Sequence, residues 1–126
     1  MANPISPELT TGTLGELLVQ LRLLQYGVQA APALKDSGND LIAVRGFEVR
    51  CIQVKTTRNA LPAWPLDAKR YHLLAIVRLA GEGCELRLDD CQLYLLRKEE
   101  LPTDRTWDAL PTFALTRERV DELFPV

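Results

Sequence analysis

Residues 38–57 contain two short apolar runs separated by a glycine, and this feature constrains the fold more than any other. The first run is Leu41–Arg45 and the second is Glu48–Thr56. Both have the length and the apolar character of strands. The pair Gly46-Phe47 between them suits a two-residue turn with glycine in its first position. The sequence therefore predicts a β-hairpin.

Three polar side chains interrupt these runs: Asp40 before the first strand, and Gln53 and Lys55 within the second. Burying such groups in a sheet is unfavourable unless partners or water satisfy them. Pairing from the turn places Asp40 opposite Gln53, and the two-residue period of a strand points Lys55 to the same face. Because Ile42 and Cys51 lie further along that face, we expect the first helix to cover it. The hairpin is thus predicted to gather a carboxylate, an amide and an ammonium group.

Leucines at helical spacing predict an amphipathic helix from Thr13 to about Tyr26, closed by Gly27. Thr13 and Glu16 match a capping box. Glu16 lies in the first turn of this predicted helix and could reach the polar end of the hairpin. A second, shorter amphipathic helix is predicted in residues 116–126. Its expected inward side chains are Val120, Leu123 and Phe124.

The remaining segments are expected to complete a single α/β domain. Residues 28–40 are predicted to form a loop, and residues 58–70 a short edge strand followed by a helical turn. Residues 71–79 and 91–101 are apolar and predict two further strands. The chain of 126 residues is long enough for one core and short for two.

Composition narrows the class of protein. No run of about 18 apolar residues occurs, and the first residues lack the basic flank and apolar stretch of a signal peptide. We therefore expect a soluble, cytoplasmic protein with no membrane partner. The 3 cysteines are odd in number and the chain has 1 histidine, so neither a disulfide framework nor a zinc site is indicated.

Positive charge concentrates in the middle third of the chain. The net charge is −2 overall, but −1 for residues 1–34, +3 for residues 35–70 and −4 for residues 71–126. Such charges usually form a solvated face. As phosphate contacts they would give affinity for DNA that does not depend on sequence and falls with salt. The candidate DNA contacts are Arg45, Arg50, Arg58, Lys69 and Arg70.

The groups expected at the polar end of the hairpin suit a divalent metal ion. The carboxylates of Asp40 and Glu16, the amide oxygen of Gln53 and the carbonyl oxygen of Val54 are hard donors that Mg²⁺ or Mn²⁺ accepts. A metal ion held in this way binds a phosphodiester oxygen and lowers the pKa of a bound water. Lys55 beside it would orient that water or neutralise the transition state. The set predicts hydrolysis of a phosphodiester.

The same residues resemble a known family. A helix glutamate at Glu16, then Asp40, then Gln53-Val54-Lys55 one hairpin later resembles the PD-(D/E)XK nuclease superfamily over roughly residues 12–58. The run IQVKTT is similar to the branch of intron-encoded homing endonucleases and junction-resolvase-like proteins.

The resemblance implies a restriction-endonuclease-like fold, with a central mixed sheet of four to five strands flanked by helices. It also implies Mg²⁺-dependent cleavage of DNA and assembly into a homodimer or a higher oligomer. By this match Asp40 is the first metal-binding acid, Gln53 occupies the Asp/Glu position and Lys55 is the motif lysine. Glu16 is the supporting helix glutamate.

Two positions depart from the family pattern, and they leave other interpretations open. Asn39 stands where the family has proline, and Gln53 replaces a carboxylate, which removes a negative charge and lowers the expected metal affinity. One alternative is a catalytically weakened nuclease-fold module that binds DNA or a protein partner. Another is a structural subunit whose acidic last third docks to a partner. Taken singly, Glu16 is typical of a helix cap and Asp40 of a turn.

Overall fold

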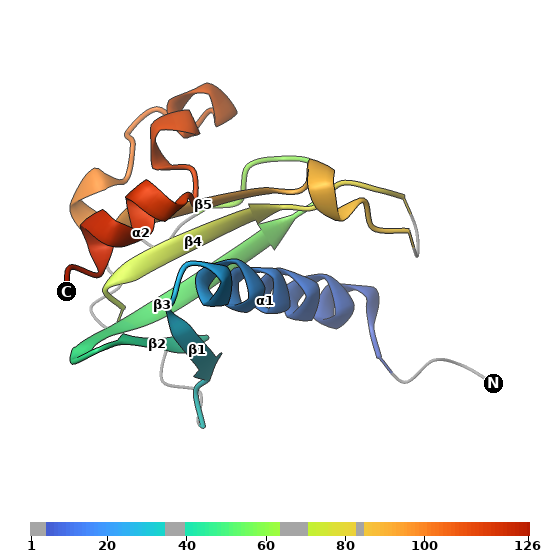
Figure 1. The fold of residues 1–126 in the computed structure, drawn as a ribbon. Coiled ribbons are helices and arrows are strands. Elements are labelled where there is room, and N and C mark those ends of the chain that lie inside the picture. Colours follow the sequence, from blue (N-terminus) through green and yellow to red (C-terminus); the bar gives the residue numbers. More distant parts are fainter. Residues whose placement is uncertain (1–4, 35–39, 64–70, 83–84) are drawn as a thin grey trace.

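The computed structural model describes residues 5–34, 40–63, 71–82 and 85–126, which form a five-stranded mixed sheet with two α-helices on one face (Figure 1). The strands lie in the sheet in chain order, and only the third and fourth are parallel. The predicted α/β fold with a mixed sheet flanked by helices is confirmed. The elements are α1 (Pro7–Gln25), β1 (Gln29–Pro32), β2 (Leu41–Arg45), β3 (Glu48–Thr57), β4 (Leu73–Arg78), β5 (Gln92–Arg97) and α2 (Arg117–Leu123).

The β2–β3 hairpin forms as predicted. Arg45 lies opposite Glu48, and the turn residue Gly46 has a φ of 61°, in the left-handed region that glycine adopts without a steric penalty. The last pair of the ladder is Leu41 with Ile52, whereas β3 continues to Thr57. The later part of β3 therefore pairs with β4 on one side and with no described strand on the other. We call that unpaired side of residues 53–57 the open edge of β3.

Helix α1 begins at Pro7 rather than at Thr13. The side chain of Ser6 caps the helix by accepting a hydrogen bond from the N–H of Leu9 at 3.1 Å, and proline is well suited to the first helical position. Thr13 and Glu16 lie inside the helix, so the predicted capping box is wrong. The cap was not predicted because the leucine pattern starts only at Leu14, about two turns after Pro7.

Helix α1 also packs on the sheet face opposite to the expected one. The face predicted to lie under the helix carries Ile42, which is 40% exposed, and the half-buried Cys51. Strand alternation puts the neighbouring residues on the covered face, where they form one core with both helices. That core includes Val19, Leu23, Leu41, Ala43, Ile52, Val54, Val120, Leu123 and Phe124, the last three as predicted.

Gly15 allows α1 to lie directly against β3. A Cβ at Gly15 would be 1.8 Å from Oγ1 of Thr56, far inside van der Waals contact. A Cβ at Gly12, one turn earlier, would meet nothing within 4 Å. The packing of this helix therefore requires glycine at one of the two positions.

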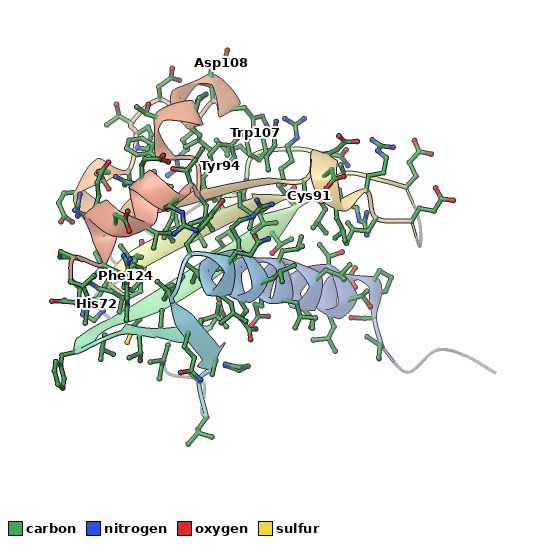
Figure 2. The ribbon with its side chains drawn as sticks, viewed as in Figure 1. His72, Cys91, Tyr94, Trp107, Asp108 and Phe124 are labelled. Atoms are coloured by element: carbon green, nitrogen blue, oxygen red, sulfur yellow. The ribbon has the colours of Figure 1, made fainter. Side chains whose placement is uncertain are left out.

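Irregular segments after β5 cover the other face of β4 and β5. Two 3-10 turns, η3 (Trp107–Ala109) and η4 (Pro111–Phe113), pack over a second buried cluster that includes Tyr94. Trp107 lies beside Tyr94, with 6.2 Å between the ring centroids (Figure 2). This layer was not predicted because 3-10 turns carry no apolar period.

Two other predicted segments differ from the structure. Residues 28–40, expected to be a loop, contain β1, whose Pro32 is tolerated because the strand lies at the edge of the sheet. Residues 58–63 form no strand, and the rest of the predicted strand and turn, with Lys69 and Arg70, lies outside the described residues. No helix in the described ranges is long and apolar enough to cross a bilayer.

The two glycines of α1 give a matched test of the packing. We expect Gly15→Ala to lower the free energy of unfolding by about 1–3 kcal/mol, because the added methyl group forces α1 away from Thr56. Gly12→Ala should raise it by about 0.5–1 kcal/mol, because alanine is the better helix former. Urea denaturation of the two variants and the wild type measures both changes. Equal stability of the two variants would contradict the packing.

Candidate functional site

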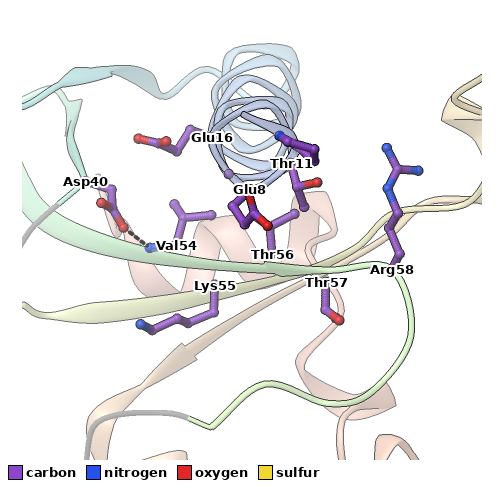
Figure 3. Close-up of a pocket in the computed structure, with 11 residues that line it drawn as sticks. Glu8, Thr11, Glu16, Asp40, Val54, Lys55, Thr56, Thr57 and Arg58 are labelled. Atoms are coloured by element: carbon purple, nitrogen blue, oxygen red, sulfur yellow. Dashed lines mark hydrogen bonds between the residues drawn. The ribbon is translucent and has the colours of Figure 1, made fainter. Parts of the chain in front are cut away.

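A pocket of about 600 Å³ lies between the first half of α1 and the open edge of β3 (Figure 3). Of the residues predicted as catalytic, Glu16, Asp40 and Lys55 line it, and Val54 does so as well. Gln53 is not among its lining residues. The structure therefore brings together most of the predicted site from three segments: α1, the residue before β2, and β3.

Asp40 lies just outside the ladder between β2 and β3 and not at its predicted position. Its N–H donates to the carbonyl oxygen of Ile52 at 3.0 Å, and Ile52 is also the partner of Leu41 in the ladder. The expectation that Asp40 lies directly opposite Gln53 is wrong. Instead the Asp40 carboxylate lies at the open edge of β3, where Oδ2 accepts a hydrogen bond from the N–H of Val54 at 2.7 Å.

Glu16 and Asp40 place two carboxylates in the same pocket. Partial burial of Glu16 raises the pKa of its carboxyl above the ordinary value, and the negative charge of Asp40 raises it further. In Figure 3 both side chains lie on the α1 side of β3. Like charges held together in this way favour a cation between them.

Lys55 reaches the pocket from the other face of β3. Strand alternation places Val54 and Thr56 on the α1 face and Lys55 on the opposite one. Figure 3 shows the Lys55 side chain beneath the strand, running back toward the end that carries Asp40. No carboxylate lies within 4 Å of its ammonium group among the described residues. Because β3 is unpaired here, a ligand at the edge could meet groups from both faces.

Gln53 shares the face of Lys55, as predicted from the strand period, but it does not share the face of Glu16. In the parallel register it lies beside Leu74, a residue of the second buried cluster. The predicted convergence of carboxylate, amide and ammonium on one face is therefore wrong. The reason is that the ladder ends at Leu41, so that strand alternation does not set the direction of the Asp40 side chain.

The backbone of β3 adds polar groups to the open edge. Within a strand the N–H and C=O of one residue point to the same side. The Val54 carbonyl therefore faces the same edge as the Val54 N–H, which donates a hydrogen bond to Asp40. Thr56 presents its backbone to this edge as well. Its hydroxyl oxygen is buried and has no hydrogen-bond partner within the described part of the chain.

Only one of the predicted DNA contacts in the described ranges lies at this pocket. Arg58 lines it, at the end of β3. Arg45 and Arg50 lie near the hairpin turn, at the opposite end of the strand, and both are paired with carboxylates. The Arg45 guanidinium is 2.8 Å from Asp121, and that of Arg50 is 2.8 Å from Glu48.

Glu8 is a member of the site that was not predicted. Glu8 lines the pocket together with Gly12 and Glu16, at the four-residue spacing of one helix face. That spacing was present in the sequence. It was overlooked because the helix was predicted to begin only at Thr13.

The donor set is compatible with a divalent cation. No group of three or more histidine, cysteine or acidic side chains able to hold a metal ion occurs among the described residues. The candidate ligands are therefore Glu16, Asp40 and the Val54 carbonyl, with water in the remaining positions. Mg²⁺ is commonly bound by one or two carboxylates together with several waters. On this chemistry Gln53 is not needed as a ligand.

Comparison with known proteins adds no relative: no family model, curated protein or solved structure matches the chain.

The raised pKa of Glu16 gives a pH-dependent prediction. The folded protein binds the Glu16 proton more tightly than the unfolded chain, so ionised Glu16 lowers the stability of the fold. That loss is absent below the ordinary pKa of glutamate and complete above the raised pKa. Glu16→Gln removes the charge, so the variant should be more stable than the wild type at pH 7. The difference should shrink as the pH falls toward 4.

Thermal denaturation across this pH range measures the effect. Glu8→Gln is the control, since it makes the same change at an exposed residue of α1 and loses a favourable charge at the helix N-terminus. An advantage of Glu16→Gln that grows on acidification would contradict the assigned burial of Glu16.

Proposed function

We propose that the protein is a metal-dependent DNA endonuclease that hydrolyses phosphodiester bonds at the open edge of β3. The observation that carries the proposal is the placement of the Glu16 and Asp40 carboxylates and of Lys55 around one pocket at an unpaired strand edge. The resemblance of these residues to the PD-(D/E)XK pattern supports the same chemistry.

Each group of the pocket has a defined role in this proposal. Glu16, Asp40 and the Val54 carbonyl hold Mg²⁺ or Mn²⁺. When bound, such an ion lowers the pKa of a water and offsets charge on the phosphodiester. The hydrogen bond from Val54 fixes the Asp40 carboxylate in place. The Lys55 ammonium approaches the phosphate from the other face and stabilises the negative charge that builds up as the water oxygen attacks phosphorus.

The reaction breaks one P–O ester bond and leaves a phosphate monoester and a hydroxyl group. Arg58 lines the same pocket. Its guanidinium group would hold a phosphate near the bond to be cleaved through paired hydrogen bonds. The described part of one chain offers one such pocket, so cutting both strands of a duplex calls for two copies. A homodimer or a higher homo-oligomer is therefore part of the proposal.

Plasmid nicking in the presence of Mg²⁺ or Mn²⁺ tests the activity. We expect the wild type to nick supercoiled DNA, and Asp40→Asn and Lys55→Ala each to reduce the rate by about 10²-fold or more. Asn at position 40 keeps an oxygen that can accept the Val54 hydrogen bond, so the loss reports charge rather than misfolding.

Two variants control for the change of charge alone. Asp108→Asn alters an exposed acid in η3, and Lys98→Ala alters a lysine next to Tyr71, beyond the other end of the sheet. Both should nick at the wild-type rate. Equal nicking by all five proteins would show that the pocket is not the catalytic site.

A second candidate function is a module of the same fold that binds DNA or a protein partner without cleaving DNA. The presence of Gln53 in place of an acid, on the face away from Glu16, favours this candidate. It predicts DNA retention at low salt without nicking, and an affinity that Asp40→Asn does not reduce. Metal-dependent nicking that is lost in Asp40→Asn would exclude it.

A further inference from the structure

A second groove continues from the candidate site past the C-terminal ends of β3 and β4. It has a volume of about 400 Å³, and its basic lining residues are Arg58, Arg78 and Arg87. Arg58 lines both this groove and the pocket that holds Glu16 and Asp40. The two cavities are therefore adjacent, and Arg58 lies between them.

Two of the three guanidinium groups in the groove are held in place without a carboxylate partner. Arg58 donates to the carbonyl oxygen of Gly81 at 3.3 Å, and the Arg78 guanidinium lies 4.6 Å from the ring centroid of Trp107. Within the described residues neither has a carboxylate oxygen within 4 Å. Both therefore keep their charge available, and their restricted side chains lose little entropy on binding an anion.

Arg87 is a weaker member of the set. Its Nε is 3.0 Å from Asp90, and both side chains are more than half exposed, at 64% and 63%. Exposed pairs of this kind are worth little and can be exchanged for another anion. Glu82 also lines the groove, so the anion must be held mainly at the Arg58 and Arg78 end.

We propose that this groove binds the phosphodiester backbone of DNA next to the bond to be cleaved, with Arg58 and Arg78 as its principal contacts. The inference rests on the proposed function for the choice of DNA as the polyanion. Successive phosphates along a strand match a path of separate guanidinium groups that leads into the metal pocket. Such contacts position the strand and do not read its sequence. The path extends from the carboxylates along the ends of the parallel strands, away from the hairpin turn.

Fluorescence anisotropy with a labelled DNA duplex in EDTA tests the groove without cleavage. The salt dependence of the binding constant counts phosphate contacts, with a slope of about −0.9 for each. We expect Arg58→Ala and Arg78→Ala each to make the slope shallower by about 1, and the double variant by about 2. Arg78→Lys keeps the charge and should retain most of the slope, which separates a phosphate contact from a packing role.

Arg117→Ala is the matched control. Arg117 is exposed and lies 5.2 Å from the ring centroid of Tyr26, at the far end of α1 from both cavities, so its loss removes the same charge and the same kind of ring contact. Its slope should equal that of the wild type. Three results would each overturn the proposal that this groove binds DNA. They are an unchanged slope in Arg58→Ala and Arg78→Ala, an equal loss of slope in Arg117→Ala, and no binding of DNA by the wild type at low salt.

Plasmid nicking is scored separately, so the two proposals can fail separately. Nicking that depends on Asp40, combined with an unchanged slope in Arg78→Ala, would exclude only the groove. A shallower slope in Arg78→Ala, combined with no nicking by the wild type, would support the groove and exclude the nuclease.

Discussion

The close packing of α1 against β3 at Gly15 and Thr56 is the contact on which the rest of the site depends. A helix can approach a strand this closely only where it has no side chain to accommodate, as at Gly15. Glu16 is the next residue along the helix. The same contact sets Glu16 above the open edge of β3, beside Asp40, and partly buries its carboxylate. Burial of one acid next to another lowers stability at neutral pH. A bound cation would offset that loss.

Much of this arrangement could be predicted from local pattern, and the errors have physical causes. The Gly46-Phe47 turn and the lengths of the strands determined the hairpin and its pairing. They could not reveal the position of Asp40, because the ladder ends at Leu41 and the Asp40 carboxylate instead accepts a hydrogen bond from the N–H of Val54. The N-terminus of α1 was mispredicted because the helix was placed by the spacing of its apolar residues alone. Ser6 and Pro7, which begin the helix, are not part of that spacing.

The net charge of each third of the sequence was only a partial guide to where positive side chains gather in the fold. The positive middle third contains Arg45 and Arg50, which the fold places near the hairpin turn with carboxylate partners. Arg78 belongs to the acidic last third, yet the parallel pairing of β4 with β3 brings it to the end of the sheet that carries Arg58. The pairing of the strands therefore decides which charged side chains lie together, and the net charge of a sequence segment does not. The groove lined by Arg58 and Arg78 becomes visible only once the strands are paired.

The central claim is that Glu16 and Asp40 share one divalent cation site at the edge of β3. Nuclear magnetic resonance of the isotope-labelled protein during titration with Mn²⁺ tests it most directly, because this paramagnetic ion broadens the signals of nearby nuclei. The account predicts saturable broadening centred on the amide signal of Val54 and the side chains of Glu16 and Asp40, and its loss in Asp40→Asn. Broadening centred elsewhere, for example on Glu82 and Asp90, or undiminished in Asp40→Asn, would contradict it.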